Sequence, residues 1–150
     1  MRILDATAGN RAIWHDKQYR DTTYFDVRDG FRFPTVKGDI RKTSFPDGRF
    51  DLIVFDPPHM TCGPKSQMAA RYGHYLTQEI RDLVRDAFAE FHRILAPNGL
   101  VAFKWNSHDT SLDAILAPVL GFDRLVENPV AMRTKHSSTT YWCLLRRVPT

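Results

Sequence analysis

The stretch Phe50–His59 (FDLIVFDPPH) decides the fold class of this chain. Residues 52–55 are all apolar, which is typical of a strand that is covered on both faces in a parallel sheet. Asp56 then places a carboxylate directly after the apolar run. The two prolines that follow it, Pro57 and Pro58, restrict the backbone to a stiff corner. We therefore expect a buried parallel strand that presents polar groups where it ends.

Strands and helices alternate outward from this stretch. The other predicted strands are short apolar or β-branched runs between turn residues, over Arg2–Asp5, Thr23–Val27, Pro34–Gly38, Leu100–Trp105, Phe122–Glu127 and Thr139–Leu145. Apolar residues at helical spacing predict helices over Thr77–Leu95 and Ser111–Leu120, and one or two helical turns are expected over Arg11–Lys17. The alternation predicts an α/β fold: a mostly parallel, twisted sheet with an antiparallel strand at its C-terminal end and helices on both faces.

The composition indicates a single domain, residues 1–150. Of the 150 residues, 43% are hydrophobic, which is enough for one buried core. Two cysteines cannot form a disulfide framework, so a reducing compartment and a cytoplasmic location are expected. The longest apolar run, Leu52–Phe55, is far shorter than the ~20 residues that cross a bilayer. No cleavable leader follows Met1, so we expect no attachment to a membrane.

The net charge and the metal-binding residue types say little about partners or metal sites. The net charge of +4 is compatible with a polyanionic partner such as nucleic acid, although many soluble proteins carry such a charge without one. The cysteines and histidines are scattered without metal-ligand spacing, so no metal site is expected.

Acidic residues follow the predicted strands, at the edge of the sheet where α/β proteins bind ligands. Asp5 ends the first strand, and small residues that let a backbone approach a ligand follow it: Ala6, Thr7, Ala8 and Gly9. Asp26 lies where a carboxylate can accept hydrogen bonds from ribose hydroxyls. Asp39, with Ile40 beside it, could accept from the amine of an adenine. Taken singly, each acid also fits an ordinary turn.

The corner at Asp56 is the most specific of these signals. Its carboxylate and the neighbouring carbonyl oxygens form a set of acceptors that suits a planar amine. The alternative is a rigid loop with a capping aspartate. The other acids at strand ends favour the functional interpretation.

Asp56-Pro57-Pro58 followed by a ring resembles the catalytic motif of amino methyltransferases that modify adenine N6 or cytosine N4. The resemblance covers nearly the whole chain and implies a Rossmann-like class I methyltransferase fold with S-adenosylmethionine as the cofactor. It implies that residues 5–9 cradle the methionine part of the cofactor, that Asp26 binds the ribose, and that Asp39 and Ile40 lie at the adenine. The chain also resembles compact phage- and prophage-associated methyltransferases, in which a stretch like 103–106 (FKWN) recurs.

Three features depart from the family pattern. The first motif has one of the usual glycines, His59 stands where the family has Tyr, Phe or Trp, and no segment is long enough for a separate target-recognition domain. An imidazole can still stack on a base or take a proton. The missing domain puts sequence-specific DNA recognition in doubt, and a catalytic domain this short can borrow surface from a second copy, so a homo-oligomer stays open.

Residues that could bind the substrate lie in two places. Lys65, Arg71 and Tyr72 belong to the long segment Met60–Leu76 and could contact phosphate and base, or be solvated. Residues at the end of the fifth strand should face the same crevice: Lys104, Trp105 and Asn106. Trp105 fits the core equally well.

The sequence therefore predicts an enzyme, a methyltransferase that uses S-adenosylmethionine and acts on an amino nitrogen of a nucleobase. Asp56, Pro57, Pro58 and His59 would be catalytic, with adenine N6 in DNA favoured and RNA kept open. The alternatives are a methyltransferase for a small molecule and a non-catalytic module that binds the cofactor. A nicotinamide-dependent oxidoreductase is disfavoured, because the three-glycine fingerprint is absent.

Overall fold

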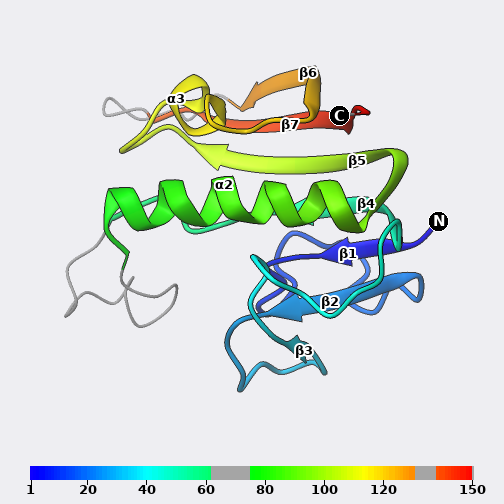
Figure 1. Cartoon of the computed structure of the whole chain (residues 1–150). Helices are drawn as coiled ribbons and strands as arrows, with labels where there is room; N and C mark the ends of the chain where they lie inside the picture. The colour runs from blue at the N-terminus through cyan, green and yellow to red at the C-terminus, as the bar shows by residue number, and fades with distance from the viewer. Residues whose placement is uncertain (62–74, 131–137, 150) are drawn as a thin grey trace.

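A computed structural model describes residues 1–61, 75–130 and 138–149, which form one seven-stranded sheet with two helices (Figure 1). The strands are β1 (Ile3–Asp5), β2 (Thr22–Asp26), β3 (Val36–Lys37), β4 (Phe50–Phe55), β5 (Leu95–Asn106), β6 (Phe122–Val130) and β7 (Thr140–Arg147). The helices are α2 (Thr77–Ile94) and α3 (Leu112–Leu116). All seven predicted strands are present, which confirms the α/β fold class.

The strand order is β3-β2-β1-β4-β5-β7-β6. The five strands from β3 to β5 are parallel, with Leu4 opposite both Thr23 and Ile53. β7 is antiparallel to both β5 and β6, so the predicted antiparallel strand at the C-terminal end of the sheet is confirmed. The carboxyl ends of the parallel strands therefore meet at one edge of the sheet, with the order reversing between β1 and β4.

Helix α2 forms because its apolar residues recur on one face. Ile80, Val84, Phe88 and Phe91 are all buried on that face, as the helical spacing predicts. The N-cap is Leu76, and its N–H donates to the carboxylate of Glu79 at 2.7 Å. This bond satisfies one of the backbone groups that the first turn of a helix leaves without a partner.

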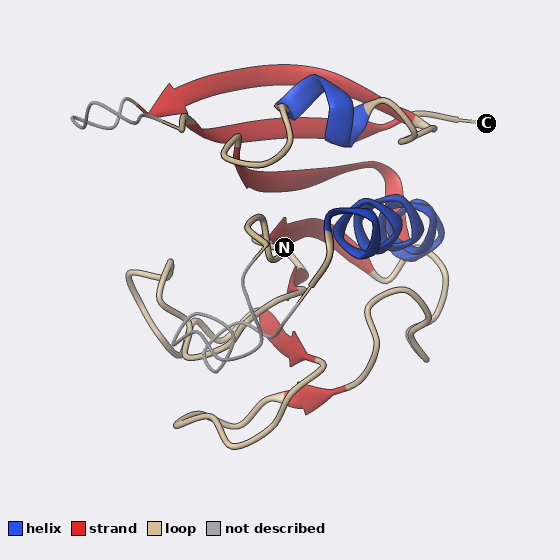
Figure 2. Ribbon diagram, turned by 90° about the vertical axis from the view of Figure 1, so that its left-hand side faces the viewer, coloured by secondary structure: helices blue, strands red, loops and turns tan. Residues whose placement is uncertain are grey.

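The core lies between these helices and one face of the sheet. Phe55, Phe88, Phe91 and Phe103 meet there edge to face or tilted, with ring centroids 5.0 to 6.2 Å apart. Both described helices lie in front of the sheet in Figure 1, and Figure 2 views α2 nearly end-on beside the strands. Helices on the second face were also predicted, but the described residues place none there.

The segment on that second face is built from turns. The predicted helical turns over Arg11–Lys17 are wrong, because the segment has only isolated turns, one of them closed by the bond from the Trp14 N–H to the Arg11 carbonyl. The Lys17 ammonium donates to the carbonyls of Arg11 and Ala12, which in a helix would accept from N–H groups four residues on. Trp14 of this segment, together with Ile3 of β1, lines a shallow apolar pocket.

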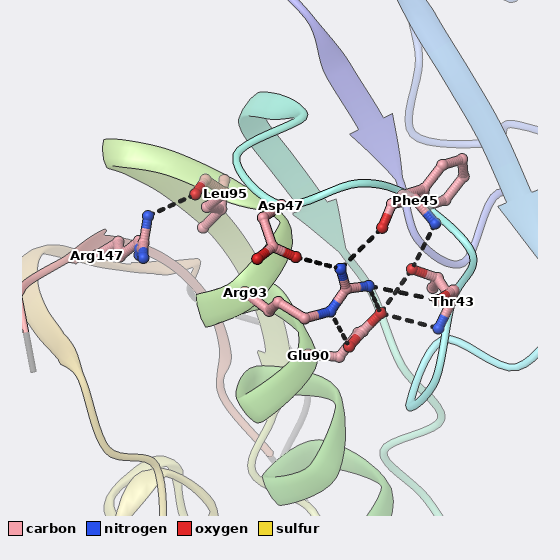
Figure 3. A network of polar contacts seen from close by, with 7 residues as sticks. All are labelled: Thr43, Phe45, Asp47, Glu90, Arg93, Leu95 and Arg147. Carbon is pink, nitrogen blue, oxygen red and sulfur yellow. Dashed lines mark hydrogen bonds and ion pairs between the residues drawn. The ribbon is translucent and has the colours of Figure 1, made fainter.

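An ion network ties α2 to the loop between β3 and β4 (Figure 3). The Arg93 guanidinium pairs with Glu90 on its own helix and with Asp47 in the loop, and it donates to the Phe45 carbonyl at 2.9 Å. Glu90 also accepts from both the N–H and the hydroxyl of Thr43. The network fixes the stretch that leads from Asp39 to β4, and it thereby supports one wall of the site described next.

Candidate active site

A cavity of about 700 Å³ opens where the parallel strands end. Its volume lies within the usual range for a small-molecule or cofactor site. The predicted residues that line it lie at the ends of β1, β2, β3, β4 and β5 or directly after them: Ala6, Thr7, Ala8, Gly9, Asp26, Asp39, Ile40, Asp56, Pro57, Pro58, His59 and Lys104. The topology brings these residues together although they are up to 98 positions apart (from 6 to 104).

The loop after β1 forms the floor of the cavity. The hydroxyl of Thr7 accepts from the backbone N–H of Asp56 at 2.9 Å, which joins the first strand end to the fourth. Gly9 has a φ of +48°, a conformation that favours glycine, and its N–H donates to Asp26 at 3.0 Å. Small residues thus line this part of the cavity, and their contact with a cofactor stays a prediction.

Asp26 is buried and carries its own counter-ion. Its carboxylate accepts from the N–H and the guanidinium of Arg28, with the shortest ion-pair contact at 3.2 Å, and from Gly9. The Arg28 guanidinium also lies 5.2 Å from the ring centroid of Phe31. The acid predicted to bind a ribose is thus covered by an arginine that lines the same cavity.

Asp39 repeats this arrangement. The Arg41 guanidinium donates to both of its oxygens, at 2.6 and 3.0 Å. The hydrogen bond from Arg41 is the main reason that the pKa of Asp39 lies below its ordinary value. Ile40 between them is buried and lines the cavity, which gives this end an apolar surface for an aromatic ring.

Asp56 stands at the other end of the cavity, between two basic groups. Lys104, from the end of β5, donates to its Oδ2 at 2.7 Å, and Nδ1 of His59 lies 3.9 Å from its Oδ1. All three side chains are largely buried. After His59, the N–H and hydroxyl of Thr61 both donate to Asp109 in the loop that follows β5, which anchors the corner.

Asp5 does not line the cavity, against the prediction of direct cofactor contact. Its carboxylate points to the second face of the sheet, where it accepts from the Trp14 indole at 2.7 Å and from the Thr7 N–H at 3.2 Å. Burial raises its pKa to about 6. The side chain holds the floor loop in place from behind.

Trp105 and Asn106 are also held away from the cavity. Trp105 is 1% exposed and donates to the carbonyl of Thr110, because side chains alternate along β5 and its neighbour Lys104 takes the cavity side. Asn106 donates to the Thr140 hydroxyl. Trp105 and Asn106 were predicted to bind the substrate, but both side chains instead make contacts within the fold. Lys65, Arg71 and Tyr72 lie outside the described residues.

Four charged residues of the cavity were missed: Arg28, Arg41, Glu79 and Asp82. The two arginines follow their acids at the same spacing, Asp-Val-Arg and Asp-Ile-Arg, and this repeated Asp-x-Arg pattern was the signal that could have found them. Glu79 and Asp82 come from the first turns of α2. The position of this helix over the cavity depends on tertiary packing, which leaves no local signature in the sequence.

Among the described residues there is neither a helix that could span a membrane nor a cluster of metal ligands. No described helix is both long enough and apolar enough to cross a bilayer. Residues 1–61, 75–130 and 138–149 also contain no group of three or more side chains placed to hold a metal ion.

No family model matches the sequence, and no curated protein matches it either. Among solved structures, the PH0226 protein of Pyrococcus horikoshii OT3 is similar with a TM-score of 0.68 at 14% identity, over 97% of this chain and 81% of that one. The 1,6-didemethyltoxoflavin-N1-methyltransferase of Burkholderia thailandensis, with 1,6-didemethyltoxoflavin and S-adenosylhomocysteine bound, gives 0.60 at 17% identity, over 98% and 71%. A protein described as a DNA modification methylase from Thermus thermophilus gives 0.51 at 21%, over 75% and 52%.

These likenesses extend over most of the chain, and they agree with its mostly parallel sheet. At such identities they show the fold alone. The chain has the Rossmann-like fold of class I S-adenosylmethionine-dependent methyltransferases.

Proposed function

We propose that the protein is an S-adenosylmethionine-dependent methyltransferase that acts on an amino nitrogen of a nucleobase, with adenine N6 in DNA favoured. One observation carries the proposal. The Asp-Pro-Pro corner presents the Asp56 carboxylate to a cavity whose opposite end holds the acids Asp26 and Asp39. One cavity thus offers acceptors for an amine and a separate end for a nucleoside.

The residues at the nucleoside end fit the cofactor. Asp26 would accept from the ribose hydroxyls, Ile40 would contact the adenine, and Asp39 would accept from its amine. The backbone around Gly9 would approach the methionine part. The cofactor supplies an electrophilic methyl group on sulfur.

The residues at the Asp56 end would orient the acceptor. Oδ1 of Asp56 and the carbonyl of Pro57 can each accept a hydrogen bond from a planar amine, and both stabilise the positive charge that develops on it. The Lys104 ammonium fixes the other carboxylate oxygen at 2.7 Å, which keeps the carboxylate from rotating. Positioning of the acceptor in this way contributes to the rate without any new bond to the protein.

The choice of nucleic acid is supported by the motif and by the fold. The Asp-Pro-Pro corner resembles that of enzymes that methylate base amines, and one structure with the same fold is described as a DNA modification methylase. The bound 1,6-didemethyltoxoflavin in another is a small molecule, so a small-molecule acceptor is the second candidate. A base in a duplex must also be flipped out, at a cost of a few kcal/mol, which a single strand largely avoids.

The test is transfer of labelled methyl groups to single- and double-stranded DNA, to RNA and to small amines. Asp56→Ala should lower the rate by about 10²–10⁴-fold while calorimetry shows unchanged cofactor affinity. Asp51→Ala, at the opposite end of the same strand and paired with Arg2, is the matched control for strand stability. If the protein binds the cofactor tightly but transfers no labelled methyl group to DNA or RNA, nucleic acid is refuted as the substrate. If Asp56→Ala is fully active, the catalytic role of Asp56 is refuted.

A further inference from the structure

The hydrogen bond of the His59 ring determines which of its nitrogens carries a proton. Nδ1 lies 3.2 Å from the carbonyl oxygen of Pro57. Because a carbonyl oxygen only accepts, Nδ1 must donate, and it carries its hydrogen in the neutral ring as well as in the charged one. The lone pair of the neutral ring is therefore on Nε2.

Nε2 is available to a ligand. The ring of His59 lines the cavity, and within residues 1–61, 75–130 and 138–149 no hydrogen-bond partner contacts Nε2. Trp105 packs against the ring nearly edge-on, with centroids 6.2 Å apart and planes at 72°. The Trp105 indole is itself fixed by its bond to the Thr110 carbonyl. The imidazole is thus held at Nδ1 and by its contact with Trp105, and its second nitrogen is left for the substrate.

The other charged groups around the cavity are already paired. Oδ2 of Asp56 accepts from the Lys104 ammonium at 2.7 Å, so these two groups are already partners of each other. On α2, Glu79 accepts from the N-cap backbone and Asp82 accepts from Gln78 and Arg85. The acids of the nucleoside end carry arginines. Nε2 of His59 is then the basic lone pair at the acceptor end that has no partner among the described residues.

We propose that His59 is a catalytic residue that takes the proton of the acceptor on Nε2 as the methyl group is transferred. This proposal rests on the proposed function and narrows it. The acceptor nitrogen gains a bond to the methyl carbon and loses its bond to hydrogen. The proton goes to Nε2, and the electron pair of the broken carbon–sulfur bond stays on sulfur. The acceptor must therefore carry an N–H at the reacting nitrogen, as an exocyclic amine does, and a bare ring nitrogen does not meet this need.

The rival role for His59 is to stack on the base, as the aromatic residue of the Asp-Pro-Pro enzymes does. The variants His59→Phe and His59→Tyr keep a stacking ring and remove the nitrogen base, so they separate the two roles. We expect both to lower kcat by about 10²–10⁴-fold with unchanged cofactor affinity by calorimetry. We also expect them to lose the acidic limb of the pH–rate profile. If His59→Phe keeps kcat within about threefold of the wild type, the role as a base is refuted.

Nitrogen NMR of the free protein gives a readout that needs no activity. In ¹⁵N-labelled protein, with His59→Phe used to assign the signals, we expect neutral His59 to carry its proton on Nδ1. A proton found on Nε2 would overturn the inference for any acceptor. The proposed function fails separately, if the wild type itself methylates no nucleobase.

Discussion

Asp5→Asn should stabilise the protein increasingly as the pH rises. Burial raises the pKa of the Asp5 carboxyl from its ordinary 3.8 to about 6 in the folded chain. The folded state therefore binds this proton more tightly than the unfolded state, and ionisation of Asp5 opposes folding. The contribution of the Asp5 carboxyl to stability is complete below its pKa in the unfolded chain. It is lost as the pH rises through its pKa in the folded chain. Asparagine never ionises and escapes this loss.

The size of the effect follows from the two pKa values. A rise from 3.8 to about 6 corresponds to ~3 kcal/mol of lost stability well above pH 6. Between about pH 4.5 and about pH 7.5 the same linkage gives a change of roughly 2 kcal/mol. Asp5 is 1% exposed, so solvent screening does not appreciably reduce this change in the free energy of unfolding. An amide keeps one oxygen for the two donors Trp14 and Thr7, at a cost of ~1 kcal/mol that is nearly independent of pH.

Urea unfolding followed by circular dichroism measures this directly, with both proteins at constant ionic strength. The free energy of unfolding of Asp5→Asn, minus that of the wild type, should grow by roughly 2 kcal/mol between about pH 4.5 and about pH 7.5. A difference that stays constant with pH would refute a raised pKa for Asp5. Because Asp5 does not line the cavity, the variant should also bind the cofactor normally.

Two further substitutions test other contacts. Arg28→Met removes the cation that covers Asp26 and should tighten cofactor binding by about fivefold, or ~1 kcal/mol, in calorimetry; weaker binding would show that the arginine itself holds the cofactor. Gly121→Ala should lower the free energy of unfolding by about 2–3 kcal/mol, since its φ is +78° and the new Cβ would lie 2.5 Å from the His92 ring. Gly30→Ala, at the same φ but in open space, should lose only the conformational part, and an equal loss in both variants would exclude the clash.

The sheet could be predicted from the sequence because its strands carry local signals. The apolar run before Asp56 lies on a short strand, Asp26 ends another, and Asp39 follows a third. Turn residues flank these strands, so the positions of the acids at strand ends followed from topology alone. Helix α2 was predicted to within one residue at its end, since its apolar face repeats over five turns.

The errors come from tertiary contacts that local patterns do not contain. Residues 11–17 can form helical turns, but the Lys17 ammonium takes their carbonyls. Lys104 and Trp105 are neighbours near the end of β5, and only the alternation of side chains on the folded sheet assigns Trp105 to the core and Lys104 to the cavity. Asp5 resembles the acids at the other strand ends, yet it faces the opposite side of the sheet.

The two Asp-x-Arg pairs, Asp26 with Arg28 and Asp39 with Arg41, bear on how such a site can be assembled. Each acid has its cation two residues away, so the pair needs almost no loop closure and can form before the strands have met. At Asp26, the buried acid of the two, the sheet then encloses a neutral unit rather than a bare carboxylate, whose burial would cost far more. When the cofactor binds, its polar groups would replace the arginines as partners of acids whose charge is already balanced. The affinity for the cofactor should therefore depend on the ionic strength of the solution.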